Sequence, residues 1–436
     1  MSLTEFFIFL FSAYPLMKKA SALLVFGILL FGCTMPDTGT GAGTGSGTGT
    51  GSGTGTSGGG TTVTPGGTTQ PPANGSQQPA VNNTPLVQPP VVSPPPQTQN
   101  RQQLIEWYVM NRLMDGNGGV KSDSGSSQYP SSSIWLVMEY ALETDNRSLF
   151  EKEYQFLKNH QLDSTHSLAY ALMQGSGLTY TPIMKNGRYY SSTGDNLRIA
   201  RYLFDAKDKW GTSAYSDTAW AISNSLLATS VFNNILVKES YWSGSTIVPA
   251  TRMRTADPEW KVMQKLSREK EGWTSVMERT RSHTLGCQES GLFWPEYNAA
   301  NPMCDYGEGL STAKTADIVA AALALAEIQT LETAIITYSK LTNEYNKEYI
   351  ISSEYTIPHN GAGNKATDPG TYAVMGRLAV ALDRCDFAEK MKGEMLRYFV
   401  SDSSSPLYGS VAIGGKAYAY DNLQALLFLE EYEDRC

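Results

Sequence analysis

The chain has 436 residues, a net charge of −8 at neutral pH and a sequence pI near 5.2. This acidity argues against nucleic acid as a partner, because a phosphate-binding surface needs an excess of basic residues. Hydrophobic residues make up 41% of the chain but are scarce over residues 34–100. Residues 101–436 are enough for one large domain or two smaller ones.

The N-terminus carries an export signal. Residues 17–33, MKKASALLVFGILLFGC, resemble a lipoprotein signal, which predicts lipidation of Cys33 and makes Met17 a plausible true start. The apolar run is short for a transmembrane helix. The alternative is one long hydrophobic anchor over residues 1–32. Both interpretations predict an exported protein tethered to the membrane or cell surface, with residues 1–33 as the targeting segment.

Residues 34–100 are of low complexity. Gly-Thr-Ser repeats are followed by a segment rich in Pro, Gln and Asn. Such compositions cannot bury enough apolar surface to offset the entropy of ordering. We expect a disordered linker that holds the domain at 101–436 away from the membrane.

Beyond Cys33, four cysteines remain, and an even number in an exported chain predicts two disulfides. We expect Cys287 to pair with Cys304, and Cys385 with Cys436, which fixes the C-terminus. Zinc binding is the weaker alternative, because no two of these cysteines have the close spacing of a zinc site. No metal is expected.

From Arg101 onward, apolar residues recur mainly at helical spacing. Two segments, 180–192 and 243–255, are expected to be extended and to form short hairpins. About twelve helices are predicted, mostly in pairs joined by short turns. In chain order they lie near 101–113, 131–142, 146–157, 165–174, 194–208, 213–234, 256–282, 311–331, 332–349, 369–384, 386–399 and 416–433.

Twelve helices in pairs predict an all-α (α/α)6 toroid, in which an inner ring of helices stands inside an outer ring. An open solenoid is the alternative. The segment 315–330, TADIVAAALALAEIQT, is apolar around most of its circumference, as expected for an inner helix that is buried on both sides. The ends of the inner helices are then expected to line a cleft.

The residues available for chemistry are mainly acids and aromatics. The four histidines have no metal-ligand spacing, and no phosphate-binding or dinucleotide-binding loop is found, so no cofactor is expected. The chain has 24 tyrosines and 8 tryptophans. Aromatic faces stack on sugar rings and carboxylic acids carry the protons in glycoside hydrolysis, so this composition favours a sugar site.

One stretch, residues 191–211 (SSTGDNLRIARYLFDAKDKWG), predicts a helix capped by Ser192 or Thr193 with Asp195 in its first turn. By itself such an acid is a favourable charge at the positive end of a helix. Residues 192–210 also resemble the signature helix of glycoside hydrolase family 8, an (α/α)6 toroid. Ser131–Ser133, Met138, Asp145–Asn146 and Phe150 follow the rhythm of a second family element, and residues 419–426, AYDNLQAL, resemble the closing inner helix of related toroids.

The chain departs from this family at the catalytic positions. The general-acid Glu of the family falls on Ser132, and the two signature Asp positions fall on Gly194 and Asn196, with Asp195 between them. The resemblance therefore implies the fold and a sugar cleft, whereas the standard mechanism does not transfer intact.

We expect Asp195 to serve as base or charge stabiliser, because a helix N-terminus favours the ionised form. A proton donor is expected from residues 287–309, with Glu289 and Glu308 as candidates, since a carboxyl packed against Trp294 is expected to hold its proton. The alternative is a stapled surface loop with an aromatic plug. Expected sugar contacts, each with core packing or helix capping as the alternative role, are Trp135, Tyr190, Arg198, Trp294 and Asp421.

The sequence thus predicts a monomeric, membrane-tethered glycoside hydrolase that acts on a polysaccharide or oligosaccharide. One alternative is a toroid that binds carbohydrate without catalysis, because the family acids are missing at Ser132 and Gly194. Another is a structural surface lipoprotein without a ligand.

Overall fold

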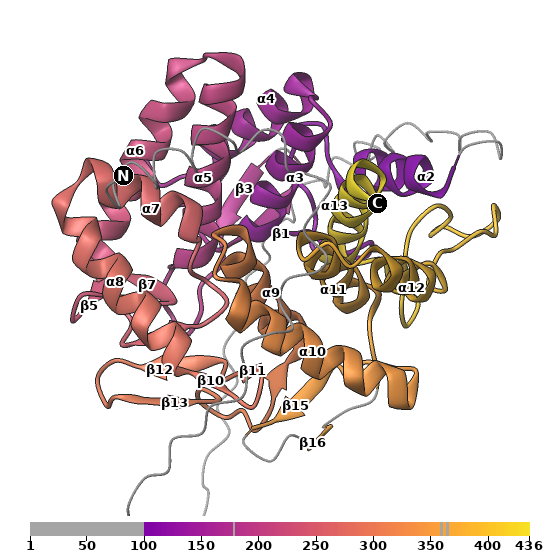
Figure 1. Cartoon of the computed structure of the whole chain (residues 1–436). Helices are drawn as coiled ribbons and strands as arrows, with labels where there is room; N and C mark the ends of the chain where they lie inside the picture. The colour runs from indigo at the N-terminus through magenta and orange to yellow at the C-terminus, as the bar shows by residue number, and fades with distance from the viewer. Residues whose placement is uncertain (1–99, 178, 358–360, 363–365) are drawn as a thin grey trace, which may run out of the picture. The chain divides into compact units, whose positions relative to one another are not determined.

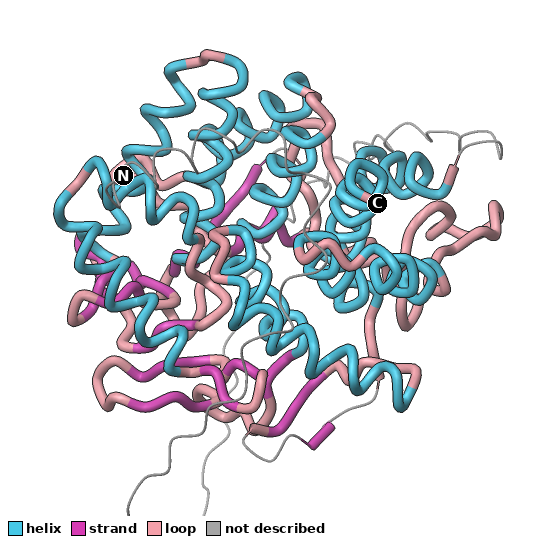
Figure 2. The backbone as a smooth tube through the Cα atoms, viewed as in Figure 1, coloured by secondary structure: helices cyan, strands magenta, loops and turns pink. Residues whose placement is uncertain are grey.

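The computed structural model describes residues 100–177, 179–357, 361–362 and 366–436, all within one compact unit (Figure 1). Cys33 and the predicted signal and linker lie outside the described residues. Figure 2 shows that helices make up most of the described chain, with strands as short pieces between them. The twelve α-helices of the described part are α2 (Arg101–Tyr108), α3 (Ser131–Glu143), α4 (Arg147–Phe156), α5 (Thr193–Trp210), α6 (Ser213–Thr229), α7 (Trp260–Glu269), α8 (Glu271–Gly286), α9 (Thr315–Glu327), α10 (Leu331–Glu348), α11 (Pro369–Ala381), α12 (Cys385–Leu396) and α13 (Ala419–Arg435).

Six helices form a closed inner ring. Each of α3, α5, α7, α9, α11 and α13 packs on the next, and α13 packs back on α3 (Figure 1). Outside this ring, α4, α6, α8, α10 and α12 each pack on the inner helix that precedes them, and α2 packs on α13. The predicted (α/α)6 toroid is therefore confirmed.

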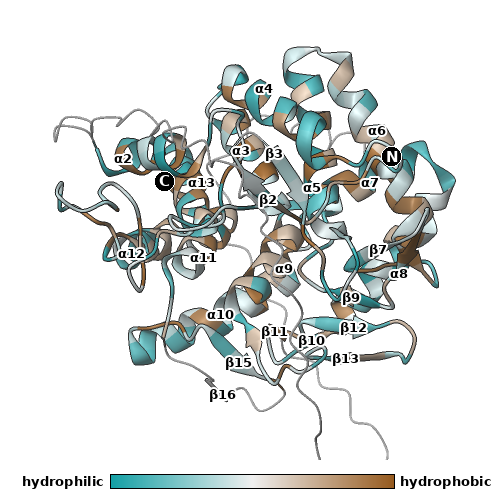
Figure 3. Cartoon of the chain, turned by 180° about the vertical axis from the view of Figure 1, so that it is seen from behind, coloured by the Kyte–Doolittle hydropathy of each residue, from teal (hydrophilic) through white to brown (hydrophobic). Residues whose placement is uncertain are grey.

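Burial distinguishes the two rings. Twelve of the thirteen residues of α11 are buried, whereas only four of the eighteen residues of α10 are. Figure 3, which views the molecule from behind, shows α9 mostly in white to brown and α12 largely in teal. An inner helix is covered by the ring on one side and by an outer helix on the other, so apolar residues can occupy most of its circumference. This confirms the expectation from residues 315–330.

Short antiparallel strands join the helices at their ends. They form three-stranded sheets in the orders β1-β2-β3, β4-β7-β8, β13-β12-β9 and β14-β15-β16, and the pairs β5-β6 and β10-β11. Their bounds are β1 Gln128–Pro130, β2 Leu172–Ser176, β3 Thr179–Pro182, β4 Tyr190–Ser192, β5 Val231–Phe232, β6 Ile235–Leu236, β7 Glu239–Ser243, β8 Thr246–Pro249, β9 Arg252–Arg254, β10 Gln288–Glu289, β11 Leu292–Phe293, β12 Glu296–Asn298, β13 Met303–Asp305, β14 Ala313–Lys314, β15 Glu354–Thr356 and β16 Gly361–Ala362. Two π-helical turns, Val109–Leu113 and Leu157–Gln161, extend α2 and α4.

Two helix predictions were wrong. The helix expected at 165–174 does not form, because the N–H groups of Tyr170 and Ala171 bond to Gln161 and Tyr190 instead of to a preceding helical turn. The single helix expected at 256–282 is two helices, α7 and α8, which meet at Lys270, an extended residue with φ −142° and ψ 120°. The extended segments 180–192 and 243–255 do contain strands, as expected.

Both disulfides form as expected. Cys287 pairs with Cys304, and Cys385 pairs with Cys436. The first bond joins the end of α8 to β13, and the second fixes the last residue of the chain to the start of α12. Among the described residues, none of the helices is both long enough and apolar enough to cross a bilayer.

Candidate active site

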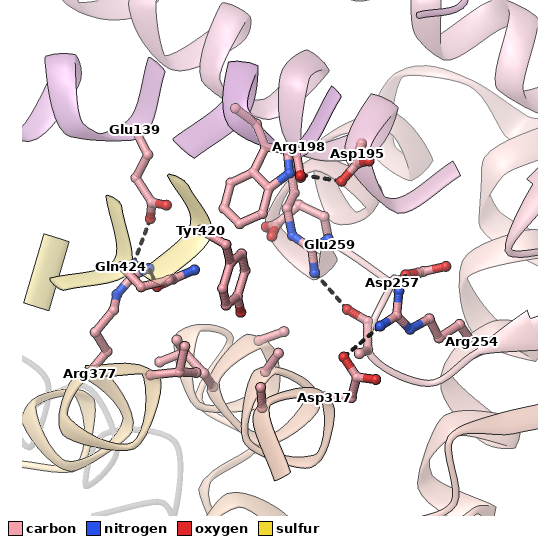
Figure 4. A pocket seen from close by; sticks show the side chains of 18 of the residues that line it. Glu139, Asp195, Arg198, Arg254, Asp257, Glu259, Asp317, Arg377, Tyr420 and Gln424 are labelled. Atoms are coloured by element: carbon pink, nitrogen blue, oxygen red, sulfur yellow. Dashed lines mark hydrogen bonds and ion pairs between the residues drawn. The ribbon is translucent and has the colours of Figure 1, made fainter. Parts of the chain in front are cut away.

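A cleft of about 440 Å³ opens at the N-terminal ends of the inner helices (Figure 4). Its walls receive an aspartate from, or just before, five of the six: α5, α7, α9, α11 and α13. The sixth, α3, brings Ser132. Helix N-termini favour negative charge, so this end of the ring is suited to hold carboxylates. The aspartates are Asp195, Asp257, Asp317, Asp368 and Asp421, and three glutamates, Glu139, Glu259 and Glu327, also line the cleft.

Asp195 is held from two sides by neutral donors. Its Oδ2 accepts a hydrogen bond of 2.7 Å from the Ser131 hydroxyl, and its Oδ1 accepts one of 2.9 Å from Trp135 Nε1. The guanidinium of Arg198 lies over the Trp135 ring, 4.9 Å from its centre. Ser192 caps the helix by accepting from the Asp195 N–H. These donors hold the Asp195 carboxyl at a fixed position in the cleft.

A second acid, Asp257, lies beside this group. It is 7% exposed, and burial raises the pKa of its carboxyl to about 7 against the opposing effect of Arg254 and Arg198. Arg254 makes its short ion pair, 2.6 Å, with Asp317, and lies 3.9 Å from Asp257. Figure 4 shows these three residues together at one side of the cleft. Two neighbouring acids therefore differ: Asp317 has a close cation and Asp257 does not.

Asp421 stands on another part of the wall, without a cation. It is 7% exposed and has no hydrogen bond or ion pair with any described residue. Burial, and then the charge of Asp368, raise the pKa of Asp421 to about 7. Asp368 itself caps α11 by accepting from the N–H and hydroxyl of Thr371. Gly370 leaves room for the Asp421 carboxyl, because a Cβ there would collide with Oδ1.

The floor of the cleft is a set of buried ion pairs. Arg201 bonds to Glu327 at 2.9 Å and contacts Glu259 at 3.0 Å. Arg377 bonds to Glu139 at 2.7 Å, and Figure 4 shows this pair on the side of the cleft away from Asp257. Because their partners compensate them, these arginines serve to fix the inner helices together, and the charges left for a ligand are nearer the mouth.

A second hollow of about 320 Å³ adjoins the cleft and shares five lining residues with it: Ser192, Arg254, Asp257, Lys314 and Asp317. Its far wall is the face of the β4-β7-β8 sheet that carries Tyr190 and Glu239. Lys185 pairs with Glu239 at 3.0 Å and lies over the Tyr190 ring. The acids around Arg254 therefore stand at the junction of two connected spaces, an arrangement that suits an extended ligand.

The structure brings five of the predicted site residues to these spaces and leaves three outside. Asp195, Trp135, Arg198 and Asp421 line the cleft, and Tyr190 lines the adjoining hollow. The side chains of the other three lie away from both: Glu289 is exposed and accepts from Trp294 Nε1, Trp294 packs on Tyr306, and Glu308 is exposed in a turn. The expected donor region, 287–309, does not line the cleft with Asp195 and reaches only the adjoining hollow, through Pro295 and Glu296. Glu296 is paired with Lys238 and Arg252.

Sequence reasoning missed Asp257, Asp317 and Asp368 as site residues. All three have the signal that drew attention to Asp195 and Asp421, which is an acid in the first turn of an inner helix or just before it. The pattern becomes recognisable only when the inner helices are told apart from the outer ones.

The structure also explains the amide at the second signature position. Asn196 is fully buried, accepts from the N–H of Ala169 at 2.9 Å and donates to the carbonyl of Ser192 at 2.8 Å. Asn422 repeats the arrangement in α13 with Val411 and Tyr418. A carboxylate has no donor for these carbonyls, so both positions need an amide. Both asparagines fix the start of an inner helix to the segment before it.

The described residues contain no group of three or more His, Cys, Asp or Glu side chains arranged to hold a metal ion.

No family model matches the sequence. A segment of 125 residues, 28% of this chain, is 30% identical to YdaJ, a predicted lipoprotein of Bacillus subtilis (strain 168), and covers 32% of that protein, so the match spans about a third of its length. A solved structure described as a novel alpha-amylase from Clostridium perfringens superposes with a TM-score of 0.67 at 19% identity, over 76% of this chain and 98% of the other.

Endoglucanase Cel10 from Klebsiella pneumoniae, a family 8 glycosyl hydrolase, superposes with a TM-score of 0.56 at 14% identity, over 76% of this chain and all of Cel10. At these identities the likeness concerns the fold. The chain therefore has the glycoside hydrolase-like (α/α)6 fold of family 8 enzymes, together with a lipoprotein relative.

Proposed function

We propose that the protein is a membrane-tethered glycoside hydrolase that cleaves a polysaccharide in the cleft at the N-terminal ends of its inner helices. The observation that carries the proposal is the set of carboxyls gathered there, because glycoside hydrolysis needs one protonated and one ionised carboxyl on either side of the bond. Asp195 and Asp257 differ in their surroundings: Asp195 accepts hydrogen bonds from Ser131 and Trp135, whereas burial raises the pKa of Asp257 to about 7.

In this proposal Asp195 is the base that activates water or stabilises positive charge on the sugar ring. Trp135 positions the Asp195 carboxylate through its Nε1, and Arg198 covers the face of the indole. Tyr420, whose ring points into the middle of the cleft in Figure 4, and Tyr190 in the adjoining hollow supply surfaces for sugar rings. The proton donor is then sought among the cleft acids rather than at Glu289 or Glu308, which lie outside it.

Export and tethering form the second part of the proposal. The lipoprotein-like residues 17–33, the two disulfides and the predicted lipoprotein YdaJ all support it. Lipidation of Cys33 followed by the linker 34–100 leaves the toroid free to reach an extracellular polysaccharide.

The test uses the full-length chain in mild detergent, incubated with β-glucans, xylan, chitosan and exopolysaccharides. We expect new reducing ends from at least one polymer, and a loss of at least a hundredfold in Asp195→Asn. The exposed Asp217→Asn on α6 is the control and retains full activity. An absence of reducing ends from every polymer, at long incubation times, contradicts the proposal.

The second candidate is a toroid that binds carbohydrate without cleaving it, and the serine and glycine at 132 and 194 favour it. In that case an oligosaccharide binds without turnover, and Asp195→Asn leaves its affinity unchanged. Turnover that is abolished in Asp195→Asn excludes this alternative.

A further inference from the structure

Asp257 lies where the two connected spaces meet. It belongs to the short segment between β9 and α7, and its side chain lines both the cleft and the adjoining hollow. A sugar chain that occupies both spaces therefore passes this carboxyl. At the same time Asp257 is only 7% exposed, so a bound chain shields it from water almost completely.

The position of this carboxyl depends on Gly194, the second residue of α5. A Cβ on residue 194 would lie 2.8 Å from Cγ and Oδ1 of Asp257, and 2.9 Å from its Cβ. Real Cβ atoms do not approach other atoms this closely. Any side chain at 194 must therefore displace Asp257, which means that the glycine creates the space in which the carboxyl of another segment stands beside Asp195.

The nearest cation to Asp257, Arg254, makes only a long contact of 3.9 Å with it. Arg254 forms an ion pair of 2.6 Å with Asp317. Arg198 donates a hydrogen bond of 2.6 Å from Nη2 to the carbonyl of Ala256. Burial has the largest effect on the Asp257 carboxyl, and it raises the pKa to about 7. Arg254 and Arg198 lower the pKa of this carboxyl, whereas the carboxyls of Asp195 and Asp317 raise it. A carboxylic acid with a pKa of about 7 carries a transferable proton in about half of the molecules at neutral pH.

We propose that Asp257 is the proton donor of the hydrolysis and that Gly194 is the residue that admits it to the cleft. The inference rests on the proposed function. As the bond between C1 and the bridging oxygen breaks, the oxygen keeps the electron pair and takes the proton of Asp257. Asp195 accepts a proton from the water whose oxygen bonds to C1. The two chain ends then leave, and proton exchange with solvent restores both carboxyls.

The experiment compares a poor leaving group with one that needs no proton. The full-length protein and Asp257→Asn are assayed on the polysaccharide that the wild type cleaves, and on cellobiosyl, xylobiosyl and chitobiosyl fluorides. We expect Asp257→Asn to lose about 10²- to 10⁴-fold on the polysaccharide, but to stay within about tenfold of wild type on the fluoride, because fluoride leaves unprotonated. Asp195→Asn is expected to lose activity on both substrates.

A pH profile gives a second readout. Wild-type hydrolysis of the polysaccharide is expected to fall above about pH 7, as the donor loses its proton, while hydrolysis of the fluoride does not fall there. A merely structural role for Asp257 affects both substrates alike.

Gly194→Ala tests whether the glycine admits Asp257 to the cleft, because this variant keeps every carboxyl of the cleft but its Cβ displaces that of Asp257. We expect it to behave as Asp257→Asn does: activity on the fluoride retained and activity on the polysaccharide lost. The control is Gly393→Ala in α12, where a Cβ meets nothing within 4 Å. Thermal unfolding of each variant shows whether it is folded, and the retained fluoride activity shows that the cleft is intact.

The outcomes separate the two proposals. If the wild type cleaves a polysaccharide and Asp257→Asn cleaves it equally well, or loses both substrates equally, the inference is overturned and the hydrolase stands. If Gly194→Ala matches the wild type, the steric argument is overturned. If the wild type cleaves neither polysaccharide nor fluoride, the proposed function fails and the donor role fails with it.

Discussion

Replacement of Asp421 by asparagine is expected to stabilise the protein at neutral and alkaline pH but not at acid pH. The carboxyl is 7% exposed and has no hydrogen bond or ion pair with a described residue. Its pKa rises from 3.8 to about 7 because of burial and the nearby Asp368. The folded state therefore holds a proton that the unfolded chain releases above pH 4, so the contribution of this group to stability is complete below pH 4 and is lost as the pH rises through 7.

The magnitude follows from the two pKa values. They differ by about three pH units, and each unit corresponds to about 1.4 kcal/mol, so the wild type loses about 4 kcal/mol from this group between pH 4 and pH 8. Asparagine does not titrate. The difference in unfolding free energy between Asp421→Asn and wild type is thus expected to be about 1 kcal/mol at pH 4.5 and to approach about 4 kcal/mol at pH 8.

The assay is urea unfolding with both disulfides intact, at pH 4.5, 6 and 8. Asp217→Asn, at an exposed position on α6, serves as the control and should change stability equally at all three pH values. A difference for Asp421→Asn that varies by less than about 1 kcal/mol between pH 4.5 and 8 refutes the reasoning, because a pKa elevated to about 7 predicts a variation of about 3 kcal/mol over this range.

Three further predictions concern the fold. Glu153 is fully buried, neither of its carboxyl oxygens has a hydrogen-bond partner, and burial raises its pKa well above 4.5. Glu153→Met is therefore expected to raise the unfolding free energy by about 1–3 kcal/mol at pH 7. This gain in stability should shrink toward pH 4, where the glutamate is neutral in both the folded and the unfolded state. The double variant Cys385→Ser, Cys436→Ser is expected to lower the unfolding free energy by about 4 kcal/mol, because this disulfide closes a loop of 51 residues in the unfolded chain. The Cys287–Cys304 bond closes a loop of only 17 residues. If removal of the Cys385–Cys436 bond lowers the unfolding temperature less than removal of the Cys287–Cys304 bond, the loop-length argument is contradicted. Asn196→Asp replaces buried donors by a charge and is expected to cost at least about 1–3 kcal/mol, measured by urea unfolding; equal stability at pH 7 argues against the proposed role of the amide.

The local sequence pattern was enough to predict the helices and their pairing. Apolar residues at helical spacing identify a helix wherever it is buried, and an inner helix such as α9 is distinguished by being apolar on nearly all sides. The pattern failed at 165–174, where the backbone hydrogen bonds of Tyr170 and Ala171 go to residues that are distant in sequence or in another segment. No periodicity reports such partners.

The cysteines were paired correctly from their number and positions, because four cysteines allow only about three pairings. The acid at 195 and the acid at 421 were recognised from their places in the first turns of two helices. Whether these two acids share a cleft depends on the ring, in which α5 and α13 pack on either side of α3.

The sequence by itself determined that this is an all-α toroid with an acid-lined helix start at Asp195, because helical periodicity and capping are local properties. Only the tertiary structure decided which carboxyls share a cleft. It left Glu289 and Glu308 outside, and it placed Asp257 against Gly194, two residues 63 positions apart in the chain. The space at a glycine and the burial of a carboxyl arise from the packing of separate segments, and such contacts have no signature within either segment alone.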